Sequence, residues 1–298
     1  MMNFFQFNFP VSEVETFIFI PPLIAFIISF FTSMAGISGA FLLLPFQMSV
    51  LGFTTPSVSS TNLLFNVAGT PGGVYRYMKE GRLVWPIAIA IVTGIMPGVL
   101  IGYYLRVKYL PDPMAFKLFV GLVLMVVAFR LIKEVWTSKT KIAADTGRLK
   151  DKVVNLSMGF KKIRFDFKEV TYSIHSIGFF TLSFAVGIIG GIYGIGGGSI
   201  IAPFCIAFFN LPVHTIAGAV LLGTFTSSAA GVIFYSLISI NGSTAAPDWT
   251  LGILFGIGGL FGMYFGAKYQ RYVPEKIIKI ILALIILTVA TKYILQFF

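Results

Sequence analysis

The sequence predicts an all-α, polytopic transmembrane protein made of two inverted repeats of about five hydrophobic segments each. Three observations carry this prediction: the composition, a motif that occurs twice, and the placement of the basic residues. The 298-residue chain is 57% hydrophobic and only 11% charged, with a mean hydropathy of +0.90. A soluble domain has about 25% charged residues, so this chain cannot cover its surface with wettable groups. We therefore expect a multi-pass protein of the cell (inner) membrane.

A glycine-rich turn that leads into a short apolar stretch with a proline occurs twice, 158 residues apart. The copies are residues 36–46, GISGAFLLLPF, and residues 194–204, GIGGGSIIAPF. From residue 36 to 77, ten of 42 pairs aligned at this offset are identical, and the match extends to Tyr77 and Tyr235. Two halves that interrupt their hydrophobic segments at the same place point to a transporter with its binding site between the repeats.

Ten apolar segments follow along the chain. The first half has segments at 15–35, 38–52, 57–78, 84–106 and 113–135, and the second at 172–194, 197–210, 214–240, 249–269 and 275–297. The second segment of each half is short, and about 14 helical residues cover only about 21 Å of a hydrocarbon core about 30 Å thick. We expect these two segments to be broken or re-entrant helices after the Gly-rich turns, which leaves eight to ten crossings; whether they span fully stays open.

Three parts of the chain follow from this reading: residues 1–135 as the first transmembrane repeat, 136–171 as a basic cytoplasmic linker, and 172–298 as the second repeat. Nine of the 22 basic residues lie between 139 and 168. Two interpretations stay open for the charged stretch at 161–168, a solvated linker or an amphipathic helix on anionic lipid.

The basic residues also predict the orientation of the halves. The short loop with Arg76, Lys79 and Arg82 is expected in the cytoplasm, whereas the loop 241–248 has no basic residue and is expected outside. The third segments of the two halves then point in opposite directions, so the repeats are inverted. Arg106 and Lys108 disagree with this scheme, because alternation places them outside.

A candidate binding site comes from the turns and from the third segment of each half. A helix that starts at a turn inside the membrane aims its N–H groups at a cavity, where they attract anions; alternatively, the glycines only permit close packing. The third segments carry amides and hydroxyls at steps of three and four, and such groups either join helices or replace a ligand's hydration shell. The candidate substrate-binding residues are Ser38, Gly39, Asn62, Asn66, Thr70, Gly196, Gly197, Ser199, Thr224 and Ser228.

Other residues have weaker signals. Glycines recur every fourth residue in both fourth segments, which indicates close packing between repeats or between protomers; they are Gly94, Gly98, Gly102, Gly258, Gly262 and Gly266. Arg76 is a candidate for anion steering at the inner mouth, with snorkelling as the simpler alternative. His214 is a candidate gate, with an interfacial role as the simpler alternative.

Several classes of function lack support in the sequence. No acidic residue lies inside an apolar segment, there is one cysteine, and no nucleophile–base pair or metal-ligand spacing occurs. We therefore expect no enzyme activity, no cofactor and no metal. The basic residues behind the net charge of +11 are distributed as in membrane proteins, so we expect the lipid bilayer as a partner and no nucleic acid. The donors at the helix starts add a small anionic substrate as an expected partner. A homodimer stays open.

The two Gly/Pro segments, each followed by a Ser/Thr-rich helix, resemble the sulfite exporter TauE/SafE family over nearly the whole chain. The resemblance rests on Gly36, Ile37, Ser38 and Gly39 with Pro45, and on Gly194, Ile195, Gly196, Gly197 and Gly198 with Pro203. It implies a secondary transporter, an exporter, of small sulfur-containing anions such as sulfite or organosulfonates. An anion channel of the same architecture or a permease for another small organic anion are the alternatives, and a structural subunit is a further one.

Overall fold

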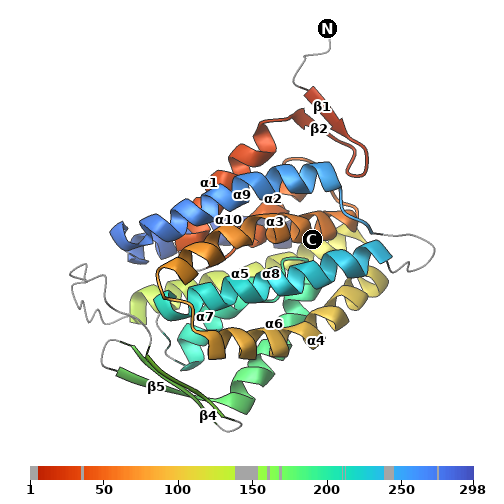
Figure 1. The fold of residues 1–298 in the computed structure, drawn as a ribbon. Coiled ribbons are helices and arrows are strands. Elements are labelled where there is room, and N and C mark those ends of the chain that lie inside the picture. The colour runs from red at the N-terminus through yellow and green to blue at the C-terminus, as the bar shows by residue number, and fades with distance from the viewer. Residues whose placement is uncertain are drawn as a thin grey trace.

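A computed structural model defines the fold: the residues that it describes form a bundle of ten helices with two small antiparallel sheets at its ends (Figure 1). The structure describes residues 6–34, 37–137, 154–159, 162–167, 170–209, 211, 213–237, 245–273 and 275–298. The first half contains β1 (Gln6–Phe9), β2 (Val14–Phe17), α1 (Ile20–Met34), α2 (Ala40–Ser49), α3 (Ser57–Lys79), α4 (Trp85–Tyr109) and α5 (Pro113–Thr137). The remainder contains β3 (Val154–Met158), β4 (Lys162–Phe167), β5 (Val170–His175), α6 (Ser176–Tyr193), α7 (Gly198–Phe209), α8 (Val213–Leu237), α9 (Trp249–Tyr269), the 3-10 turn η1 (Gln270–Tyr272) and α10 (Glu275–Leu295).

The helices confirm the all-α, polytopic fold class. Within the described residues, five helices are long and apolar enough to cross a membrane, namely α4, α5, α6, α8 and α9. The segments after the two turns are short as expected, with ten residues in α2 and 12 in α7. Helix α3 has 23 residues but is less apolar, because one side of it carries buried amides and hydroxyls.

Two expectations about the helix starts are wrong. The sequence predicts the first segment from residue 15, but residues 14–17 pair with residues 6–9 as a β-hairpin. Helix α1 begins only at Ile20, with Pro21 and Pro22 in its first turn. The segment expected from residue 172 begins as the helix α6 at Ser176, because β5 occupies the residues before it. Strand pairing gives the polar backbone at each bundle end its hydrogen-bond partners.

The central linker contains a sheet rather than a helix. Strands β3, β4 and β5 form an antiparallel sheet in this order, so the amphipathic-helix interpretation of residues 161–168 is wrong for the described part of that stretch. Side chains alternate along β4, with Ile163 and Phe165 buried and Lys162 and Arg164 exposed. This period of two is what a half-buried strand requires. The domain boundaries at 135 and 171 stay predictions.

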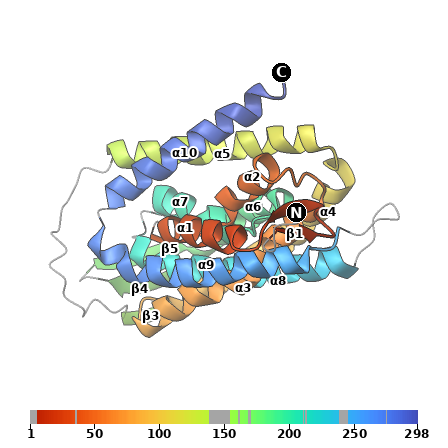
Figure 2. The same ribbon diagram turned by 90° about the horizontal axis from the view of Figure 1, so that it is seen from above.

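Helix packing is unchanged in pattern when the two halves are exchanged. Helix α4 packs on α6 as α9 packs on α1, and α3 packs on α9 as α8 packs on α4. The pairs α3–α8 and α5–α10 join equivalent helices. Figure 2 shows α5 and α10 as one layer, with the short helices α2 and α7 between this layer and α3 and α8. The short helices are thus enclosed by the longer ones.

The glycine faces of α4 and α9 lie at the contacts between the halves. A Cβ on Gly98 would lie 2.3 Å from the carbonyl oxygen of Phe184 in α6, and one on Gly262 would lie 2.5 Å from that of Phe26 in α1. Phe26 and Phe184 are 158 residues apart, the offset of the repeated motif. Only glycine allows backbones this close, so the packing role expected for these residues holds between the repeats.

Helices α3 and α8 cross in opposite directions at the centre of the bundle. Leu63 of α3 contacts Gly231 of α8, and the equivalent Leu221 of α8 contacts Gly73 of α3. Gly218 near the start of α8 contacts Tyr77 near the end of α3. The bundle therefore has a Tyr77 end, where α3 stops and α8 starts, and an opposite end, where α4 stops with Arg106. The inverted arrangement of the repeats in a bilayer stays a prediction.

Candidate functional site

The two Gly-rich turns meet inside the bundle. The Ser38 and Ser199 hydroxyl oxygens, one from each turn, are 2.9 Å apart, and both side chains are buried. The second turn depends on glycine, because Gly194 and Gly196 have φ of 77° and 72°. Gly194 ends α6 and its N–H bonds back to the carbonyls of Gly190 and Gly191, which reverses the chain and starts α7 in the interior.

Asn66 of α3 is the centre of the polar cluster at this meeting point. Its amide nitrogen donates to the Ile195 carbonyl at 2.8 Å and to the Ser228 hydroxyl at 3.1 Å. Its side-chain oxygen accepts from the Ser38 hydroxyl at 2.9 Å. Asn66 thus joins both turns and α8, and it is fully buried. We call Ser38, Asn66, Ser199 and Ser228 the central polar cluster.

A second group of amides lies beside the cluster. The Asn62 amide donates to the carbonyls of Ala40 and Gly194 at 3.1 Å each, and its oxygen accepts from Gln47 at 3.2 Å. Gln47 of α2 is completely buried, its side-chain oxygen has no partner among the described residues, and the sequence reading missed it. The available signal was a single amide in an otherwise apolar segment. An amide side chain inside a membrane needs a hydrogen-bond partner, so Gln47 would be expected to face the protein interior rather than lipid.

The remaining candidates have different contacts. The hydroxyls of Thr70 and Thr224 donate to carbonyls one turn back in their own helices, at 2.7 Å and 3.0 Å. Gly196 lies against the Ser228 hydroxyl and therefore borders the cluster. Gly39 packs on Ser29 and Phe65, and Gly197 packs on Ile95 and Gly187, so both lie at contacts with neighbouring helices. The structure thus brings together about half of the expected residues.

The two residues considered as gate or steering groups lie elsewhere. Arg76 near the end of α3 forms an ion pair with Glu80, which also pairs with Arg82. Its guanidinium also lies 5.8 Å from the centre of the Tyr264 ring. His214 belongs to the first turn of α8, and its side chain lies outside the described residues. Both roles stay predictions.

The central polar cluster is neutral and enclosed. Its members are amides and hydroxyls, and among the described residues no group of three His, Cys, Asp or Glu side chains could hold a metal ion. The Ser38 hydroxyl also accepts from the N–H of Ala40 at the start of α2, so the helix start contributes a donor here. Donors of this kind suit an oxyanion, whose lone pairs they can satisfy without adding a negative charge.

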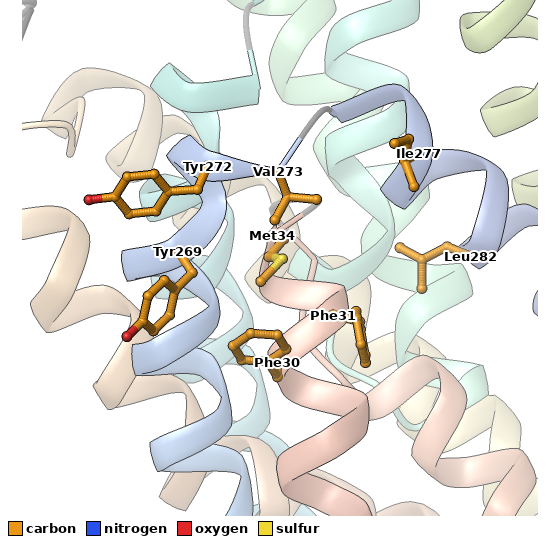
Figure 3. A pocket seen from close by; sticks show the side chains of 8 residues that line it. All are labelled: Phe30, Phe31, Met34, Tyr269, Tyr272, Val273, Ile277 and Leu282. Carbon is orange, nitrogen blue, oxygen red and sulfur yellow. The ribbon is translucent and has the colours of Figure 1, made fainter. Parts of the chain in front are cut away.

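Two of the pockets differ from the central polar cluster in the chemistry of their lining. A small pocket beside Ser199 is otherwise lined by apolar side chains and Tyr193. Figure 3 shows a second pocket at the Tyr77 end of the bundle, lined by the side chains of Phe30, Phe31, Met34, Tyr269, Tyr272, Val273, Ile277 and Leu282. The two tyrosine hydroxyls in Figure 3 point away from the other lining residues. An apolar recess of this kind suits an acyl chain better than an anion, so the central polar cluster is the candidate site.

The apolar helices, five of which in the described residues are long enough to cross a bilayer, define a polytopic membrane protein. The family model of the sulfite exporter TauE/SafE family matches residues 22–293, so the chain belongs to this family. It is a multi-pass membrane protein, as the sequence predicted.

Curated relatives have the same character. The chain is 23% identical over 276 residues to the "Probable membrane transporter protein YunE" of Bacillus subtilis, a match that covers 89% of this chain and 92% of the relative. It is 29% identical over 96 residues to the "Probable membrane transporter protein YdhB" of the same organism, covering 32% of this chain and 36% of the relative. No solved structure matches the chain.

Proposed function

We propose that the protein is a secondary transporter that exports small sulfur-containing anions such as sulfite or organosulfonates through the central polar cluster. The family supports the substrate class by its description. The single observation that carries the site is the 2.9 Å contact between Ser38 and Ser199, with Asn66 bonded to both turns. Donors from both halves therefore meet at one point inside a membrane-embedded bundle.

Transport requires the mutual hydrogen bonds of the cluster to be replaced by bonds to the anion. Each lost bond between neutral groups inside a membrane protein costs only about 0.6 kcal/mol on average. Bonds to an ionised acceptor are about twice as strong as bonds between neutral groups, so an oxyanion can compensate for the exchange. The strongest helix contacts join one half to the other, so helices of both halves have to move together to expose the cluster at either end.

The absence of a carboxylate in the cluster supports export driven by the membrane potential. A potential that is negative inside drives an anion outward by about 2.3 kcal/mol per charge per 100 mV. This free energy sustains an anion concentration gradient of nearly two decades per charge without a coupling ion. The cluster is buried, and this favours a carrier over the channel alternative. A channel would show unitary conductance in bilayer recordings.

The test is sulfite efflux from proteoliposomes with an imposed potassium diffusion potential. We expect efflux to rise with the potential in the wild type. Asn66→Leu removes the amide that bonds to both turns and should lower the rate at least about tenfold, the equivalent of one charge-assisted hydrogen bond. Ser38→Ala and Ser199→Ala should each lower it less. Efflux that ignores the potential but requires a pH gradient rejects the uniport.

Thr226→Val is the matched control. This residue lies in α8 like Ser228, but its hydroxyl donates only to carbonyls of its own helix, Leu222 and Gly223. The control should transport at the wild-type rate. If Asn66→Leu and the two serine variants also transport at that rate, the central polar cluster is not the site.

A further inference from the structure

A buried arginine lies at the end of the bundle opposite Tyr77. Arg106, in the last turn of α4, is completely buried, and its guanidinium carbon lies 3.6 Å from the centre of the Phe116 ring of α5. Its Nη1 donates to the Leu110 carbonyl. Its Nε and Nη2 have no hydrogen-bond partner among the described residues. Nε and Nη2 form one edge of the planar guanidinium, the edge that binds an oxyanion through two parallel hydrogen bonds.

A second unpaired group accompanies this edge. The buried hydroxyl of Tyr235 of α8 also has no hydrogen-bond partner in the described part of the chain. The Tyr235 ring lies 5.3 Å from the ring of Tyr103, whose own hydroxyl is bonded to the Ser227 carbonyl at 2.8 Å. Tyr103 precedes Arg106 by one turn of α4, so these side chains share one side of the helix.

No negative charge in the described residues balances this cation. The two ion pairs found there both involve Glu80, which lies at the Tyr77 end. Asp112 follows the end of α4, but its carboxylate is exposed and accepts from the N–H of Ala115 at 2.7 Å. A buried charge without a partner is strongly destabilising. A permanently structural arginine would be expected to have its donors satisfied.

The equivalent position in the other half shows what a satisfied network looks like. The every-fourth-residue series of α4 continues from Gly102 to Arg106, and that of α9 continues from Gly266 to Gln270. Gln270 is neutral and bonded on both sides. Its oxygen accepts from the Tyr77 hydroxyl at 3.1 Å and from Arg82 at 3.2 Å, and its nitrogen donates to the Met34 carbonyl at 2.8 Å.

We infer that Arg106 and Tyr235 form a second anion-binding site, which receives a small oxyanion at the end of the bundle opposite Tyr77. The guanidinium edge takes two oxygen atoms of the anion, and the Tyr235 hydroxyl donates to it. The identity of the anion rests on the proposed function, whereas the site rests on the unpaired donors. By the expected orientation this end faces outward, so an exported anion would pass from the central polar cluster to Arg106 before release.

The test is equilibrium binding of radiolabelled sulfite to the purified protein in detergent. Binding that survives Asn66→Leu reports the second site, and Arg106→Gln on this background should weaken it by about 10- to 100-fold, the value of hydrogen bonds to a charged group. Tyr235→Phe should weaken it by a smaller factor. Arg106→Lys keeps the charge without the two-donor edge and should recover only part of the affinity.

Arg130→Gln is the matched control. This arginine of α5 also lies over aromatic rings, 4.7 Å from the centre of Phe208, but it is partly exposed. The Arg130→Gln variant should bind sulfite as tightly as the Asn66→Leu protein in which it is made. The inference is overturned if no sulfite binding survives Asn66→Leu, or if Arg106→Gln and Tyr235→Phe leave the surviving binding within twofold. The proposed function fails separately, when Asn66→Leu changes neither efflux nor binding.

Discussion

At the Tyr77 end of the bundle, Gln270 has hydrogen-bond partners for both its oxygen and its nitrogen, whereas at the other end two donors of the equivalent Arg106 have no partner within the described ranges. The two equivalent tyrosines also differ in hydrogen bonding. The Tyr77 hydroxyl bonds to Gln270 and to the Ser33 carbonyl, whereas the Tyr235 hydroxyl has no partner among the described residues. The surrounding scaffold does not differ, because the same glycine faces hold α4 on α6 and α9 on α1.

This contrast separates two roles of the repeat. Backbone contacts through glycine are kept in both halves, because a Cβ at these places would overlap a carbonyl of the facing helix. Polar side chains are free to diverge, since each needs only a partner of matching chemistry. At one end the neutral Gln270 bonds to Arg82, which is paired with Glu80, and at the other end Arg106 has no ion pair among the described residues.

The largest effect is expected from making the Tyr77 end resemble the other. Gln270→Arg removes the acceptor of Tyr77 and places a second buried cation beside Arg82. We expect the free energy of unfolding to fall by about 3–5 kcal/mol, as for other uncompensated buried charges. Unfolding in detergent, followed by circular dichroism, measures it. The reverse change, Arg106→Gln, should leave stability unchanged or raise it when no anion is present; a fall as large as that of Gln270→Arg would contradict the comparison.

A smaller effect is expected from the ion pairs at the Tyr77 end. Glu80 pairs with Arg76 and Arg82, and its side chain is 17% exposed. Glu80→Gln should cost about 1–3 kcal/mol of unfolding free energy, less than a fully buried pair, because water reaches the site. The loss should shrink as salt is added to the unfolding experiment. Glu15→Gln, in the exposed face of β2, is the control and should have no measurable effect.

The smallest effects are expected from the two tyrosines. Tyr77→Phe removes a hydroxyl that makes two bonds and leaves the Gln270 oxygen with one donor, so unfolding should become easier by about 1–2 kcal/mol. Tyr235→Phe removes a hydroxyl without a partner and should change stability by less than about 0.5 kcal/mol. Melting temperatures of the two variants, measured side by side without added anion, decide this. Equal losses would mean that the two ends are chemically alike.

The sequence by itself determined the features that depend on local pattern. Long apolar segments, the positions of the two turns and the amides of α3 are visible because hydrophobicity and helical spacing act over a few residues. The same pattern predicted that the turns and the third segments share a site, and Ser38, Asn66, Ser199 and Ser228 do contact one another. Strands β1, β2, β3, β4 and β5 were missed, because short strands have weak signals in the sequence.

Only the tertiary structure decided which partner each polar group has. Asn66 bonds to Ile195 and Ser228 because α3 and α8 cross at this point, and no local pattern records a crossing. For the same reason, the sequence did not reveal that Gln47 bonds to Asn62 beside the cluster, or that Gly39 packs on Ser29 and Phe65. Arg106 appeared in the sequence as an exception to the charge rule, and its burial against Phe116 gives that exception a cause. Whether a polar group is satisfied depends on the helices that surround it, and their arrangement is a property of the whole bundle.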